Sequence, residues 1–126
     1  MLTFGSSFSG FSVNDHAAAL AFYRDTLGLS VEDTGMGLAV QLPGGGHVFL
    51  YPKQNHEPAT FTVLNFEVDD IDAAVAELEA AGVTLERYAG MPQDEKGVMR
   101  GKATGNGPDI AWFTDPAGNI LSVLAG

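Results

Sequence analysis

The stretch Phe11-Ser-Val-Asn-Asp15 decides the fold, because its pattern returns later in the chain as Phe66-Glu-Val-Asp-Asp70. Each copy opens an alanine-rich segment that ends at a glycine. The similarity then resumes, with Gly28-Leu-Ser-Val-Glu32 matching Gly82-Val-Thr-Leu-Glu86. Two copies are too few for a solenoid, so the repeat predicts a duplicated supersecondary unit, with any central site between two pseudo-equivalent halves.

The periodicity within each copy predicts a strand followed by a helix. Apolar side chains alternate in residues 8–13 and 63–68, which is typical of half-buried strands. One residue of the Asn14-Asp15 pair, and later one of the Asp69-Asp70 pair, can cap the helix that follows by accepting from its free backbone N–H groups. The expected apolar helix faces are Leu20, Tyr23 and Leu27 in the first copy and Ile71, Val75 and Leu78 in the second.

Three shorter extended segments follow each helix, near 29–34, 37–42 and 47–51 in the first copy and near 83–88, 109–113 and 119–124 in the second. The Gly-rich stretch 89–108 is long enough to predict a functional or mobile loop. One helix for every four strands is too few for a doubly wound parallel sheet. We therefore expect the α+β class, with two tandem βαβββ modules that form a cupped, mainly antiparallel sheet with helices outside.

Length and composition predict a single domain over residues 1–126, because 126 residues with 45% hydrophobic content can bury a sizeable core. We place module one at 1–52, a connector at 53–59 and module two at 60–126. No apolar run is long enough to span a membrane, and no secretory signal opens the chain, so the expected localisation is cytoplasmic, with no membrane partner. The absence of cysteine excludes disulfides and thiolate ligands.

The charge balance excludes one class of partner. Sixteen Asp and Glu residues against six Lys and Arg give a formal net charge of −10, which argues against nucleic acid, because phosphates require a basic surface. The same charge favours solubility and also attracts cationic ligands.

Three motifs carry a resemblance to a known family. They are Phe11-x-Val-x-Asp15, the helical Ala21-Phe-Tyr-Arg-Asp-Thr-Leu-Gly28, and Ala111-Trp-Phe-Thr-Asp-Pro-Ala-Gly-Asn119. Together they resemble the vicinal oxygen chelate superfamily, which includes glyoxalase I, bleomycin-resistance proteins and extradiol dioxygenases. The resemblance covers essentially the whole chain and implies two βαβββ modules around a cupped cavity, commonly in a homodimer. It implies no single activity, because this scaffold hosts many chemistries.

The resemblance also implies where a metal would be held. Enzymes of the superfamily take a His, Gln or Glu ligand from the first and the last strand of each module, because such donors suit a divalent metal with open positions. The matching positions here are Phe8, Phe49, Val63 and Ser122. Three hydrocarbons and one hydroxyl cannot hold a divalent cation, so we expect neither a metal nor another cofactor. His47 and Glu67 are the best remaining donors on the predicted strands, and we expect no rebuilt site from them.

Strand parity predicts an apolar, aromatic hollow on the sheet face away from the helices, which is typical of a small-ligand pocket. Trp112 and Tyr51 can stack on a ligand there or pack in the core. Met99 and Arg100 can close over a ligand, with Arg100 binding an anionic or carbonyl group, or can lie in a solvated loop. No spacing identifies a catalytic residue. The candidate ligand-binding residues are Phe8, Phe49, Tyr51, Val63, Asn65, Met99, Arg100, Trp112 and Ser122.

Two functions from different classes remain open, besides a structural or regulatory domain without a ligand. The favoured interpretation is a metal-independent small-molecule-binding protein of the glyoxalase/bleomycin-resistance type, which sequesters an aromatic or cationic compound. The alternative is a lyase, isomerase or dioxygenase-like enzyme of the same superfamily with an atypical or absent metal site. The expected partners are a small-molecule ligand and a second copy of the chain in a homodimer.

Overall fold

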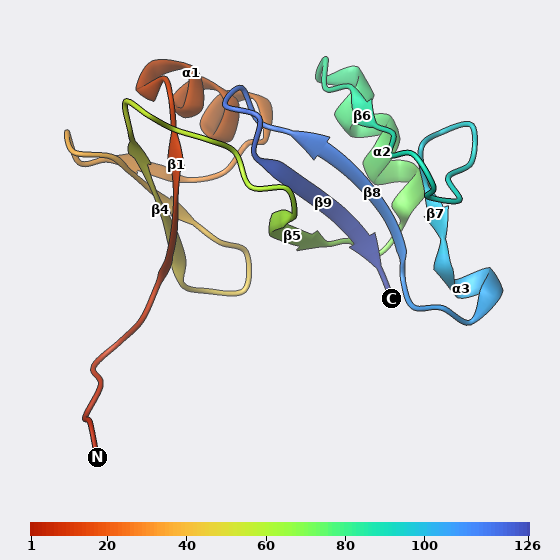
Figure 1. Cartoon of the computed structure of the whole chain (residues 1–126), viewed down its shortest axis with the longest axis horizontal. Helices are drawn as coiled ribbons and strands as arrows, with labels where there is room; N and C mark the ends of the chain where they lie inside the picture. The colour runs from red at the N-terminus through yellow and green to blue at the C-terminus, as the bar shows by residue number, and fades with distance from the viewer. The chain divides into compact units, whose positions relative to one another are not determined.

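The computed structural model describes residues 1–126, which form two compact units, Met1–Pro58 and Ala59–Gly126. Each unit runs through a strand, a helix and further strands (Figure 1). The predicted α+β class and the repeated βαβββ pattern are therefore confirmed. None of the helices combines the length and the apolar character needed to cross a membrane.

The first unit contains a four-stranded sheet in the order β1-β4-β3-β2. Strand β1 pairs parallel with β4, while β2 with β3 and β3 with β4 pair antiparallel, so this sheet is mainly antiparallel as predicted. The strands are β1 (Ser9–Val13), β2 (Val31–Asp33), β3 (Leu38–Gln41) and β4 (His47–Pro52).

The helix of the first unit is α-helical only at its start. Asp15 caps α1 (His16–Leu20), with its carboxylate accepting from a backbone N–H of the first turn, and η1 (Ala21–Thr26) continues as a π-helix. Tyr23 of η1 is fully buried, and Gly28 follows the helix with a φ of +73°. The apolar spacing predicted the helix and its buried face, but it could not predict the wider π turn, because both helix types bury the same side chain.

The second unit contains a five-stranded sheet in the order β5-β9-β8-β6, in which β7 also pairs with β8. Only the pairing of β5 with β9 is parallel. Asp70 caps α2 (Ile71–Ala80), and this helix packs against β8 and β9. The strands are β5 (Thr62–Glu67), β6 (Leu85–Glu86), β7 (Met99–Arg100), β8 (Asp109–Thr114) and β9 (Ile120–Ala125).

The stretch 89–108, predicted as a loop, contains two short elements that the sequence did not reveal. These are β7 and the single-turn helix α3 (Gly101–Thr104). Elements this short show no apolar periodicity. Gly101 is required where it lies, because a Cβ there would collide with the carbonyl oxygens of Gly107 and Pro108.

The pleat of β8 and β9 separates a helix face from a helix-free face. Since α2 packs on these two strands, the almost fully buried Ala111, Phe113, Leu121 and Val123 line the face that it covers. Their neighbours in sequence point to the other side. The helix-free face of the second sheet therefore carries Ile110, Trp112, Thr114, Ile120, Ser122 and Leu124.

The turn between β8 and β9 depends on one buried carboxylate. Asp115 is 4% exposed and accepts hydrogen bonds from the backbone N–H groups of Ala117 and Asn119 and from the Asn119 amide.

Asp115→Ala leaves these donors without their acceptor, so it should lower the free energy of unfolding by about 2–4 kcal/mol, measured by urea denaturation. The matched variant Asp25→Ala, at an exposed carboxylate, should change it by less than about 0.5 kcal/mol. Equal effects of the two substitutions would contradict this role of Asp115.

Candidate functional site

Three predicted site residues lie in one row across the helix-free face of the second sheet. Ser122 of β9 is in register with Asn65 of β5 on one side and with Trp112 of β8 on the other. Ser122 is fully buried and Trp112 is 7% exposed. The Ser122 hydroxyl donates a short hydrogen bond of 2.5 Å to the amide oxygen of Asn65. This row is the centre of the candidate site.

The indole of Trp112 is held by a residue that the sequence analysis missed. Its Nε1–H donates to the Thr62 hydroxyl at 3.2 Å. The pairing of β5 with β9 shifts register between Thr62 and Leu64, which leaves Val63 as the extra residue of a β-bulge. Strand parity assumes an unbroken pleat, so it identified Val63 and overlooked Thr62.

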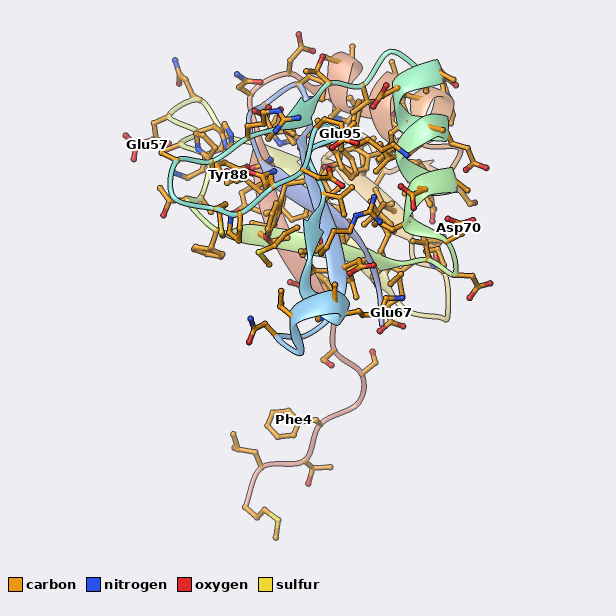
Figure 2. The ribbon with its side chains drawn as sticks, turned by 90° about the vertical axis from the view of Figure 1, so that its right-hand side faces the viewer. Phe4, Glu57, Glu67, Asp70, Tyr88 and Glu95 are labelled. Carbon is orange, nitrogen blue, oxygen red and sulfur yellow. The ribbon has the colours of Figure 1, made fainter.

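Tyr88 and Glu86 complete the surroundings of Trp112. Glu86 is in register with Trp112 and accepts from the Thr114 hydroxyl at 3.1 Å. The Tyr88 ring, on the segment after β6 (Figure 2), meets the indole edge-on, with ring centroids 5.7 Å apart and an interplanar angle of 78°. Burial, and then the charge of Glu86, raises the pKa of Tyr88. Glu86 and Tyr88 share one parity of the predicted strand 83–88, but neither was among the residues expected to bind a ligand.

The predicted site residues of the first unit form two aromatic pairs. Phe8 lies just before β1, is 63% exposed and stacks on the ring of His47, with centroids 4.7 Å apart. Phe49 and Tyr51 of β4 are stacked with centroids 6.4 Å apart and an interplanar angle of 17°. The Phe49 ring lies so close to Gly37 that a Cβ at this position would collide with it.

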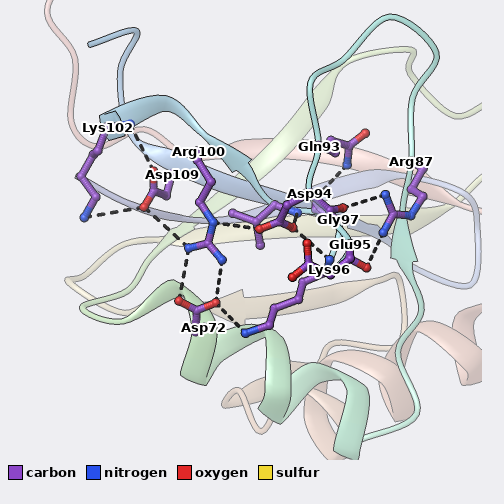
Figure 3. Close-up of polar contacts among 11 residues, drawn as sticks. Asp72, Arg87, Gln93, Asp94, Glu95, Lys96, Gly97, Arg100, Lys102 and Asp109 are labelled. Carbon is purple, nitrogen blue, oxygen red and sulfur yellow. Dashed lines mark hydrogen bonds and ion pairs between the residues drawn. The ribbon is translucent and has the colours of Figure 1, made fainter. Parts of the chain in front are cut away.

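Met99 and Arg100 lie on opposite faces of β7. Met99 is in register with Ile110 and so shares the helix-free face, whereas Arg100 is in register with Asp109. The Arg100 guanidinium binds both carboxylate oxygens of Asp72 on α2, at 2.7 and 3.2 Å, and also donates to Asp94 at 2.9 Å (Figure 3). The structure therefore does not bring Arg100 to Trp112, and its contact with a ligand stays a prediction.

The segment between β6 and β7 is braced by side chains rather than by regular structure. The Gln93 amide accepts from the Tyr88 N–H and donates to the carbonyls of Glu86 and Gly97. The Asp94 carboxylate accepts from the backbone N–H groups of Lys96 and Val98. These hydrogen bonds hold the segment in place between Tyr88 at its start and Met99, which follows it in β7.

The side chains at the superfamily's metal positions do not suit a divalent cation. The rings of Phe8 and Phe49 and the alkyl group of Val63 offer no donor atom. The one oxygen is the Ser122 hydroxyl, which already donates to Asn65. Neither unit contains a group of at least three His, Asp or Glu side chains placed to bind a metal ion.

Two depressions on the second unit are lined by residues other than the predicted ones. One, of about 430 Å³, lies between the end of α2 and the segment after β6, and is lined by Glu79, Gly82, Val83, Thr84, Leu85, Arg87, Glu95 and Lys96. The other is lined by Glu67, Val68, Asp69, Leu124 and Gly126. Neither contains a predicted ligand-binding residue.

Comparison with known proteins identifies the family. The model of the Glyoxalase/Bleomycin resistance protein/Dioxygenase superfamily matches residues 8–123. The chain belongs to this superfamily, as the sequence motifs indicated. A search of curated proteins found no match.

Solved structures share the fold. A lactoylglutathione lyase from Agrobacterium tumefaciens is 24% identical, with 97% of this chain and 93% of that chain covered and a TM-score of 0.64. An antibiotic binding protein from a Streptomyces species is 23% identical, with 99% and 98% covered and a TM-score of 0.65. A fosfomycin resistance protein from Listeria monocytogenes is 15% identical, with 99% and 95% covered and a TM-score of 0.70. At these identities the likeness shows the fold alone.

The ion pairs of Arg100 generate a pH-dependent prediction. Hydrogen bonds from Arg100, and then from Lys96, lower the pKa of Asp72 from 3.8 to about 2. Because the folded-state pKa lies below the unfolded one, this pairing stabilises the fold above the unfolded pKa and is lost as the pH falls through the folded pKa. Asp72→Asn should therefore be less stable than the parent at about pH 6, and the difference should close towards about pH 2, measured by urea denaturation.

The matched control is Glu77→Gln, on the same helix but at a side chain without an ion pair, which should be close to the parent at both pH values. A deficit of Asp72→Asn that persists unchanged in acid would mean that Asp72 acts by packing and not by charge.

Proposed function

We propose that the protein is a metal-independent small-molecule-binding protein of the glyoxalase/bleomycin-resistance type, which sequesters an aromatic or cationic compound without transforming it. The observation that carries this proposal is the chemistry at the superfamily's metal positions. Phe8, Phe49 and Val63 replace donors with hydrocarbon, and the Ser122 hydroxyl is committed to Asn65. In each unit these positions lack donors for a divalent metal while aromatic rings lie nearby, which suits binding better than metal-dependent catalysis.

Aromatic side chains support a planar ligand. Trp112 is held in place through its Nε1–H by Thr62, so its orientation is fixed before a ligand arrives. Preorganised rings of this kind bind planar compounds by offset stacking at little cost in side-chain entropy. The stacked pair of Phe49 and Tyr51 is a second surface of the same chemistry.

The charge of the chain supports a cationic ligand. A net charge of −10 raises the local concentration of cations, and aromatic faces attract cations further through the ring quadrupole. The fold match to an antibiotic binding protein agrees with this proposal, because it shows that the same scaffold serves ligand binding elsewhere.

We also propose a homodimer, since β1 and β5 end their sheets and a second copy can cover such edges.

The first test concerns metal. Protein purified and dialysed at neutral pH should contain no stoichiometric Zn, Ni, Mn or Fe by elemental analysis, because the four positions offer no charged or imidazole donor. A chelator should leave its thermal stability unchanged. A stoichiometric divalent metal whose removal lowers the melting temperature would favour the alternative, an enzyme with a rebuilt metal site.

The second test concerns the ligand. Metal-free bleomycin, a cationic antibiotic with an aromatic portion, should alter the fluorescence of Trp112, the single tryptophan of the chain. Calorimetry should show that Trp112→Phe, which keeps an aromatic ring, weakens binding by about 0.5–1.5 kcal/mol. Rising salt should weaken binding as well, since it screens the attraction between the cation and the acidic protein.

Phe4→Leu is the matched control, because Phe4 is an aromatic residue that is 79% exposed and outside both sheets. This variant should bind like the parent. If Trp112→Phe also binds like the parent while bleomycin still binds, the ligand occupies another surface.

A further inference from the structure

The hydroxyl of Tyr88 stands out among the polar groups around Trp112. The indole N–H, the Ser122 hydroxyl and the Thr114 hydroxyl each donate to a partner, namely Thr62, Asn65 and Glu86 respectively. The Tyr88 hydroxyl is covered from solvent and has no hydrogen-bond partner within the protein. A buried polar group without a partner costs free energy and is rare in folded proteins.

The position of Tyr88 connects this hydroxyl to the ligand-binding face. Its ring meets Trp112 edge-on at 5.7 Å, so a compound that reaches the indole also reaches the neighbourhood of Tyr88. The backbone of Tyr88 is held by the Gln93 side chain, which fixes the base of the ring. A ligand that accepts a hydrogen bond from the Tyr88 hydroxyl would therefore offset the free energy lost by burying this group without a partner.

We propose that Tyr88 determines ligand specificity by donating a hydrogen bond to a neutral oxygen acceptor, such as a carbonyl, on a planar compound that stacks on Trp112. This inference rests on the proposed function and names the ligand class for the same site. Burial and the charge of Glu86 raise the pKa of Tyr88, so the phenol stays protonated and can donate at neutral pH. The nearby Glu86 carboxylate repels anions, which favours a neutral acceptor over a carboxylate.

The covered state of the hydroxyl has a mechanical consequence. Because the Tyr88 hydroxyl is covered from solvent, a ligand can reach it only after a local rearrangement of the protein. The hydrogen bond then forms away from water, where the low dielectric constant makes it strong. Tyr88 should therefore favour compounds that carry an acceptor and give no advantage to those of equal shape without one.

The experiment compares two probes of similar size, coumarin, which carries a carbonyl, and naphthalene, which carries no acceptor. Binding is followed by the indole N–H signal of Trp112 in NMR titrations of the parent and of Tyr88→Phe. The variant should lose about 3- to 10-fold in affinity for coumarin and keep its affinity for naphthalene, because only one hydrogen bond is removed.

A second readout needs no ligand. Tyr88→Phe should raise the urea midpoint of unfolding, since it removes a buried hydroxyl that has no protein partner. Tyr23→Phe is the matched control, because Tyr23 is also buried but is not left without a partner, so that variant should not gain stability.

The outcomes separate this inference from the proposed function. If both probes bind the parent and Tyr88→Phe equally well, the role of Tyr88 is overturned while ligand binding on the Trp112 face stands. If neither probe binds the parent, the proposed planar ligand fails and the role of Tyr88 fails with it. If Tyr88→Phe lowers the urea midpoint, the hydroxyl is satisfied in the free protein, and the inference is wrong.

Discussion

The parallel pairing of β5 with β9 is the constraint on which the site depends. It places Asn65 beside Ser122, and the antiparallel pairing of β9 with β8 places Trp112 on the other side. The bulge at Val63 then brings the Thr62 hydroxyl to the indole N–H. A slip of one residue would turn Ser122 and Asn65 to opposite faces and break both hydrogen bonds. The register, more than any single side chain, therefore sets the chemistry of this face.

The helix-free face of the second sheet lacks the donors that a metal site needs. A metal site needs several charged or imidazole donors aimed at one point, and each must be held by neighbouring groups. Here the polar groups around Trp112 satisfy one another in pairs, and the rings of Trp112 and Tyr88 meet edge-on beside them. Such a face offers shape and stacking instead of a Lewis acid. The Tyr88 hydroxyl is the exception, because its hydrogen-bonding capacity is not used within the protein.

The repeat allowed much of the fold to be predicted, because capping carboxylates, helix-ending glycines and alternating strands are local signals. Asp15 and Asp70 cap the helices as expected, and Gly28 and Gly82 follow them with positive φ. The bulge at Val63 and the short β7 arise from strand pairing, which leaves no periodic trace in the sequence. The π-helix was not predicted because it buries the same side chain as an α-helix would. Parity identified Trp112 and Ser122 but missed Thr62, because it assumes a strand without a bulge. It could not reveal that Arg100 pairs with Asp72, because the partner lies on another element. Tyr88 shares the parity of Glu86 in the predicted strand 83–88 and could have been found from it.

The central claim is that a ligand binds to the helix-free face of the second sheet without a metal. An NMR map of backbone amide shifts during titration with metal-free bleomycin, in the presence of a chelator, tests this claim most directly. The account predicts that the largest shifts fall on Thr62, Asn65, Trp112 and Ser122. Shifts confined to the depression around Glu79 and Arg87, or shifts that appear only after a divalent metal is added, would contradict it.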